Sequence, residues 1–188
     1  LWQSRATPND TLFMTEIFII LGLILINGFF SMAEIALVSA RKARLEAQAD
    51  KGDADAKRAL KLANHPDTFL STIQIGITLV GVLTGIYSGG TFKEPLQNWL
   101  TQFAVIAAYA ETIATLIIVI LLTYVSLVLG ELVPKRIGLS NPEGIAKSVS
   151  VVMQTVTFIM YPFIWLLSAS SHLIMRILRM KPNDNQVT

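Results

Sequence analysis

The stretch from Gly130 to Arg136, GELVPKR, places a carboxylate, a proline and two cations at the end of an apolar run. The run begins near Thr112 and is long enough to cross a bilayer, so Glu131 would lie in its last turn. Carboxylates at membrane depth are costly, and they usually face a partner, a cavity or an ion. Pro134 lacks a backbone donor, so we expect it to break the helix and to act as a hinge. The stretch therefore predicts the ion-handling end of a membrane helix.

Two further apolar segments carry oxygen donors at membrane depth. In residues 15–38 these donors are spaced by three and four residues, so they share one helix face. Residues 68–87 add an amide, a hydroxyl and a glycine whose carbonyl an ion could approach. Oxygen donors with little negative charge suit a hard cation such as Mg²⁺ or Na⁺. The predicted ion ligands are Asn27, Ser31, Gly76, Gly130 and Glu131, and the predicted ion path adds Glu34, Gln74 and Thr78.

Several of these polar residues also have a purely structural explanation. Asn27 and Ser31 could instead make the hydrogen bonds that join packed membrane helices. Glu34 could pair with a basic residue of the loop that follows it, and Glu131 could pair with Lys135, four residues on. Both explanations stay open at the level of the sequence.

Composition places the chain in a membrane. Of its 188 residues, 53% are hydrophobic and 15% are charged, whereas soluble domains carry about 25% charged residues. The absence of cysteine excludes disulfides and thiolate metal sites, and two histidines are too few for a histidine-based metal site. The basic residues cluster beside apolar segments, which is a topology signal and gives no support for nucleic-acid binding. We find no catalytic triad, P-loop or cofactor motif, so we do not expect an enzyme.

The order of polar and apolar segments predicts three membrane helices, at residues 15–38, 68–87 and 112–133. Residues 41–64 should form two short helices divided at Gly52 and Asp53, with Asp53 as the N-cap of the second. Seven basic residues place this loop in the cytoplasm, so the N-terminus lies outside. Gly89 and Gly90 should end the second span, and a short helix is expected in the exoplasmic connection.

The segment of residues 145–179 is long and apolar enough for a fourth span, but basic residues flank both of its ends. We therefore expect both ends to stay inside, either as half-helices broken at Tyr161–Pro162 or as a belt at the cytoplasmic interface. The predicted fold is an all-α integral membrane protein. It has three transmembrane helices, cytoplasmic juxtamembrane helices and a proline-kinked re-entrant or belt helix.

Three motifs, NGFFSMAEIAL, STIQIGITLVG and GELVPKRIGLSNPEGIA, resemble signatures of the transmembrane domain of the CorC/CNNM (cyclin M) family of hemolysin-like magnesium and cobalt efflux proteins. The resemblance covers about residues 14–180. Residues 1–13 are then a leader or a cloning remnant, and residues 181–188 a linker toward cytoplasmic CBS domains. The resemblance implies a homodimer with three membrane helices per subunit in the bacterial inner membrane, with a cytoplasmic C-terminus.

The family resemblance also implies a Mg²⁺ site at membrane depth and Na⁺-linked Mg²⁺ export. It assigns the small polar pair of the first span to Asn27 and Ser31 and the third-span carboxylate to Glu131. Where the second span of the family often has Gly-Asn, this chain has Gly76 and Ile77.

The leading functional prediction is a divalent-cation transporter that exports Mg²⁺ by alternating access in exchange for Na⁺. Glu34 would control the cytoplasmic entrance, and Pro134 would permit helix movement. The alternative is a membrane scaffold or regulator that binds or senses Mg²⁺ and modulates other transporters without transporting the ion itself.

Overall fold

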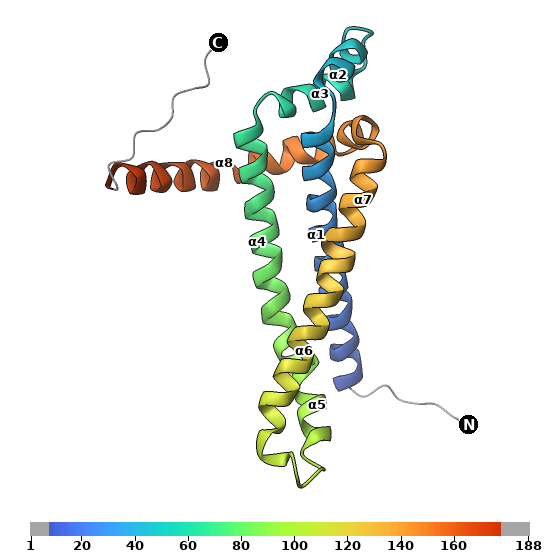
Figure 1. The fold of residues 1–188 in the computed structure, drawn as a ribbon, viewed down its shortest axis with the longest axis vertical. Helices are drawn as coiled ribbons and strands as arrows, with labels where there is room; N and C mark the ends of the chain where they lie inside the picture. The colour runs from blue at the N-terminus through green and yellow to red at the C-terminus, as the bar shows by residue number, and fades with distance from the viewer. Residues whose placement is uncertain (1–7, 178–188) are drawn as a thin grey trace, which may run out of the picture.

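The computed structural model describes residues 8–177, and within them all side chains except those of residues 8–12, 89–91 and 172. The described residues form helices and no strand. Three helical columns lie side by side along the long axis of the molecule (Figure 1). The columns are α1 (Pro8–Ser39), α4 (Pro66–Thr91), and a composite of α6 (Ala110–Leu127), the π-helical turn η2 (Val128–Leu132) and α7 (Val133–Ser140).

Short helices connect the columns at opposite ends (Figure 1). At one end α2 and α3 form a hairpin that turns at Gly52, whose φ of 93° is in the left-handed region that glycine adopts without strain. The side chain of Asp53 accepts hydrogen bonds from the backbone N–H groups of Asp55 and Ala56, at 3.0 and 2.9 Å. The predicted division of residues 41–64 into two helices at Gly52 and Asp53 is therefore confirmed, and so is the N-cap at Asp53. The connecting helices are α2 (Lys42–Ala49), α3 (Ala54–Ala63), α5 (Lys93–Leu100) and the 3₁₀ turn η1 (Ala107–Tyr109).

Much of the surface of these columns is apolar. Phe18, Ile86 and Ile120 are each more than 60% exposed, at 69%, 67% and 67%. In the described part of the chain, four helical segments are long and apolar enough to cross a membrane. A soluble protein rarely exposes so much apolar surface, so this is a multi-pass membrane protein. The four segments are Phe13–Ser39, Pro66–Leu100, Ala107–Ser140 and Pro142–Ile177.

The fourth of these segments, α8 (Pro142–Ile177), is one continuous helix with Pro162 inside it. A break at Tyr161–Pro162 is therefore not present, and a kink at Pro162 and re-entry into the membrane stay predictions. Pro162 lies on an exposed face, so the carbonyl that it leaves unpaired is not sealed in a core. Figure 1 shows α8 running across the other helices, as the belt alternative expected, rather than along them. The three-span count and the cytoplasmic position of α8 stay predictions.

The main core lies where α2, α3 and α8 meet the ends of α1 and α4. Leu45, Phe69 and Met153 are almost fully buried there, and α2 and α3 therefore belong to the packed body of the protein. A hydrogen bond of 3.1 Å joins the hydroxyls of Thr72 on α4 and Thr157 on α8 inside this region. The opposite end has a small second core between α5 and α6, around Leu100.

The third column passes through Pro134 without ending. The expectation that the helix breaks at this proline is wrong, because α7 begins at Val133 directly after the π-helical turn and contains Pro134 as its second residue. The hinge role of Pro134 stays a prediction. Gly130, Pro134 and Gly138 are buried at intervals of four residues, so one face of this column packs against α1. A Cβ at Gly138 would meet the Ile35 side chain and lie 2.9 Å from the Met32 carbonyl oxygen.

We expect Gly138→Ala to destabilise the protein by about 1–3 kcal/mol, because the added methyl group has no room between α7 and α1. The free energy of unfolding can be measured by SDS titration in mixed micelles. Gly22→Ala on α1 is the matched control, since nothing lies within 4 Å of its added Cβ. Equal stability of the two variants would contradict the packing described.

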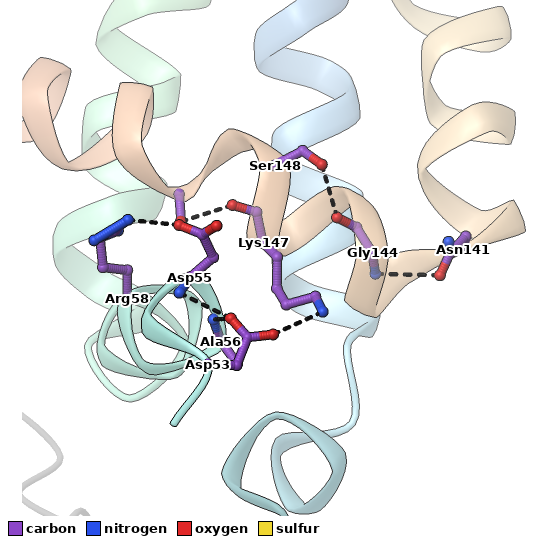
Figure 2. Close-up of polar contacts among 9 residues, drawn as sticks. Asp53, Asp55, Ala56, Arg58, Asn141, Gly144, Lys147 and Ser148 are labelled. Atoms are coloured by element: carbon purple, nitrogen blue, oxygen red, sulfur yellow. Dashed lines mark hydrogen bonds and ion pairs between the residues drawn. The ribbon is translucent and has the colours of Figure 1, made fainter. Parts of the chain in front are cut away.

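Two ion pairs attach α8 to the α2–α3 hairpin. Figure 2 shows Lys147 reaching Asp53, at an Nζ–Oδ2 distance of 3.0 Å. Arg44 lies 3.6 Å from Glu143. The N–H of Ala56 and the ammonium of Lys147 lower the pKa of Asp53, because both favour the charged carboxylate. The carboxylate of Asp53 therefore both caps α3 and forms an ion pair with Lys147 of α8.

The Asp53–Lys147 pair should make stability depend on pH. A lowered pKa stabilises the fold above the ordinary Asp pKa of about 3.9, and this contribution is lost as the pH falls through the lowered value. Asp53→Asn keeps a capping side chain but removes the charge. Wild type should therefore melt at a higher temperature than Asp53→Asn at pH 7, with the difference closing in acid. Asp50→Asn, an exposed site, serves as control; a gap independent of pH would count against the pair.

Candidate cation site

The site begins with the carbonyl that Pro134 leaves free. In a regular α-helix the N–H of residue 134 would donate to the carbonyl of Gly130, but proline has no N–H. The side-chain amide of Asn27 on α1 donates to the Gly130 oxygen instead, at 3.2 Å. Because this acceptor requires the Asn27 NH₂ group, it also fixes the direction of the amide. The other end, Asn27 Oδ1, is buried without a hydrogen-bond partner among the described residues.

Asn27 and Glu131 line the same cavity, which has a volume of about 400 Å³ and lies between α1, α4 and the α6–η2 column. Glu131 is the charged residue among the described residues that line it. Ile77, where the family often has an Asn oxygen, also faces this cavity. The polar lining residues are Asn27, Thr84, Ser88, Thr123, Ser126 and Glu131.

Lys135 lies between two carboxylates. Its ammonium is 2.7 Å from Glu131 Oε1 and 3.9 Å from Glu34 Oε2. The structure thus forms the Glu131–Lys135 pair that the sequence offered as the structural explanation, and it brings Glu34 to the same lysine. The three charges sum to −1, so the cluster keeps an excess of negative charge that could favour a cation.

The predicted ligands do not all meet. Asn27 and Glu131 line the cavity and Asn27 contacts the Gly130 oxygen, whereas Ser31 and Gly76 do not line the cavity. Ser31 is 2% exposed, and a Cβ at Gly76 would lie 2.7 Å from the Phe30 ring. The predicted ion-path residues Glu34, Gln74 and Thr78 line a different, larger groove of about 830 Å³ beside α4 and α8.

Four hydroxyl groups of the cavity were not among the predicted site residues, those of Thr84, Ser88, Thr123 and Ser126. Thr84 and Ser88 lie four residues apart on α4, so they share one helix face. Their hydroxyls donate to the carbonyls of Val80 and Gly85, at 2.8 and 3.1 Å, which leaves lone pairs as acceptors. Within the described residues no three Asp, Glu, His or Cys side chains gather to hold a metal, so uncharged oxygens would have to contribute.

We expect the Glu131–Lys135 pair to be coupled by about 1 kcal/mol in a double-mutant cycle with Glu131→Gln and Lys135→Met. Removing Lys135 alone leaves two half-buried carboxylates without the cation that lies near both, and removing Glu131 as well leaves only one such carboxylate. The more exposed pair Lys93–Glu111, at 2.8 Å, supplies the comparison cycle and should show a smaller coupling. Additive effects at Glu131 and Lys135 would contradict the contact.

A family model described as the cyclin M transmembrane N-terminal domain, CNNM, matches residues 18–188. The UPF0053 protein sll0260 of Synechocystis is 48% identical over 162 residues, which cover 86% of this chain and 36% of that protein. The polyamine export protein of Salmonella typhimurium is 32% identical over 166 residues, covering 88% and 37%. The UPF0053 protein YrkA of Bacillus subtilis is 29% identical over 160 residues, covering 85% and 37%.

The chain thus spans little more than a third of the length of these curated relatives. The family match confirms the resemblance that the three motifs indicated, and its range includes the residues of α1, η2 and α7 that are candidates for a cation site. The chain therefore belongs to the CNNM family, as its cyclin M transmembrane domain.

Proposed function

We propose that this domain exports Mg²⁺ across the bacterial inner membrane in exchange for Na⁺. The observation that carries the proposal is the cavity between α1, α4 and η2, where the carboxylate of Glu131 accompanies the buried, unpartnered Oδ1 of Asn27. A buried acceptor without a donor is rare in proteins and is explained when an ion or water occupies its site. The membership of polyamine exporters in the same set of relatives supports export as the class of activity.

The cavity suits a cation that keeps part of its water. Mg²⁺ sheds water reluctantly and is usually held by one or two carboxylates while several waters remain. At about 30 Å³ per water, six waters occupy roughly 180 Å³, which fits within the cavity of about 400 Å³. Glu131 would supply the charge, and Asn27 with Thr123 and Ser126 would bind the ion directly or through water.

The ammonium of Lys135 competes with the transported cation for the Glu131 carboxylate. With its ammonium 2.7 Å from Glu131, the carboxylate is already neutralised, and an arriving Mg²⁺ has to displace the lysine. Glu34, 3.9 Å away, can receive the displaced ammonium. The site would then alternate between a lysine-bound and an ion-bound form, and the irregular η2 turn beside Pro134 gives the chain a place to adjust.

We place the three columns across the bilayer, with α8 as a belt at the cytoplasmic interface and the N-terminus outside. The basic residues of α2 and α3 support this orientation. We propose a homodimer through the face of α4 that carries Gln74, Thr78 and Gly81, since all three are exposed in the single chain. Small and polar residues are typical of such contacts between membrane helices.

A polyamine is the second candidate cargo. Two relatives that are 32% and 30% identical to this chain bear the name polyamine export protein. The Lys135–Glu131 pair is itself a primary alkylammonium bound to a carboxylate, which is the chemistry of a polyamine end. Apolar walls of the cavity, such as Val119 and Leu122, could contact methylene groups.

The deciding experiment is flux from proteoliposomes loaded with Mg²⁺ or with spermidine, with and without an inward Na⁺ gradient. We expect Na⁺-dependent Mg²⁺ flux that Glu131→Gln reduces at least tenfold, because the variant removes the cavity's charge. Glu111→Gln is the matched control: it removes a glutamate from the far end of α6, outside the cavity. Unchanged Mg²⁺ flux in Glu131→Gln would remove the site assignment.

Ile77→Asn separates the two cargoes. It restores an amide oxygen to the cavity wall and should raise Mg²⁺ flux without raising spermidine flux. Spermidine flux that exceeds Mg²⁺ flux in wild type, and falls in Ile77→Asn, would favour polyamine export. Absence of both fluxes from correctly folded protein would favour the scaffold or regulator.

A further inference from the structure

A third cavity, separate from the cation site, opens where α3 ends, α4 begins and α8 crosses them. Its volume is about 400 Å³. Lys61 lines it from the last turn of α3, His65 from the N-cap of α4, Thr68 from the first turn of α4, and Gln154 and Tyr161 from α8. None of its described lining residues is a carboxylate, so the only fixed charge there is positive.

The two basic side chains are available to a ligand. Lys61 is exposed and forms no ion pair among the described residues. His65 Nδ1 lies 2.9 Å from the backbone carbonyl of Lys61, an acceptor, so Nδ1 carries the hydrogen and donates it. Nε2 is left as the ring atom that can bind a second group, and it becomes a donor when the ring is protonated.

The cavity is polar at one end and apolar at the other. Lys61 belongs to the polar helix α3, whereas Phe69 lies one turn inside the apolar helix α4 and is buried at the cavity wall. Phe158 and Tyr161 on α8 are 83% and 62% exposed and border the same opening. The Tyr161 ring is amphipathic, and rings of that kind lie at the boundary between headgroups and hydrocarbon.

We propose that this cavity binds the headgroup of an anionic phospholipid. Lys61 would contact the phosphate. His65 Nε2, Gln154 and the Tyr161 hydroxyl would contact the hydroxyl groups and oxygens of the headgroup, and Phe158 would lie against the acyl chains. The charge favours an anionic over a zwitterionic lipid, and the cytoplasmic leaflet offers anionic lipids to basic residues beside a span. The exposed aromatic border favours a lipid over a soluble phosphate, which would gain nothing from it.

A lipid held here would touch α3, α4 and α8 together. It would reinforce the contact already made by the 3.1 Å hydrogen bond between Thr157, which lines the cavity, and Thr72, one turn after Thr68 on α4. The inference does not depend on the cargo of the cation site, because no residue lines both cavities.

The test is native mass spectrometry of the purified protein in detergent, titrated with phosphatidylglycerol or with phosphatidylcholine of the same chains. We expect preferential binding of phosphatidylglycerol, weakened about fivefold by Lys61→Gln. Lys57→Gln is the matched control, since it removes the same charge one turn earlier on α3 from an exposed residue outside the cavity. Lys61→Arg should retain binding, which separates loss of charge from misfolding.

Three outcomes would overturn the proposal. One is equal binding of the two lipids. Another is an equal effect of Lys61→Gln and Lys57→Gln on phosphatidylglycerol. The third is displacement of phosphatidylglycerol by equimolar glycerol phosphate, which would make the site one for a soluble phosphate. Lipid extracted with the protein should also be enriched in phosphatidylglycerol for wild type and Lys57→Gln, and less so for Lys61→Gln.

Discussion

The hydrogen bond between the Asn27 amide and the Gly130 carbonyl is the interaction on which the membrane region depends. Pro134 removes the donor that would satisfy this carbonyl, and no water is present in a bilayer core to replace it. Asn27 supplies the donor from another helix, so the third column can continue through the proline into α7. The same bond orients the amide and leaves its oxygen buried beside Glu131. The Asn27 side chain thus both supports the third column at Pro134 and supplies an oxygen to the cavity.

Both carboxylates beside the cavity region, those of Glu34 and Glu131, lie within 4 Å of one ammonium group. Lys135 lies near Glu131 and Glu34, which contribute from the third column and from α1. Such a shared counter-ion lowers the cost of keeping two acids near the membrane, and it sets a threshold that any external cation must exceed. For the proposed exporter, this threshold would give selectivity for ions or polycations that bind more strongly than one tethered ammonium.

Local patterns in the sequence predicted the long apolar helices, the turn at Gly52 and the cap at Asp53, because hydrophobic runs and capping chemistry act over a few residues. They also named Asn27 and Glu131 as candidate ligands, and the structure brings both residues to one cavity. They did not show that Pro134 would be accommodated, since the compensating donor comes from a residue more than 100 positions away. Nor could spacing show that the Phe30 ring packs over Gly76 or that one lysine lies near two acids. Those facts arise from how helices rotate against each other when they pack.

The space beside the glycines differs from one part of the bundle to another. At Gly28, an added Cβ would lie 2.9 Å from the Pro134 ring, and Gly138 is as tightly enclosed, so α1 and α7 cannot slide or separate by small steps. Gly81 and Gly85 on α4 have nothing within 4 Å of an added Cβ. Gly76 on the same helix is tightly enclosed, because an added Cβ would lie 2.7 Å from the Phe30 ring of α1. The contacts of α1 with α7 and with the part of α4 near Gly76 are therefore close, whereas α4 has space beside it from Gly81 to Gly85. If the cavity opens to alternate sides of the membrane, α1, α7 and the first part of α4 will move as one body, and the later part of α4 will be the part that tilts.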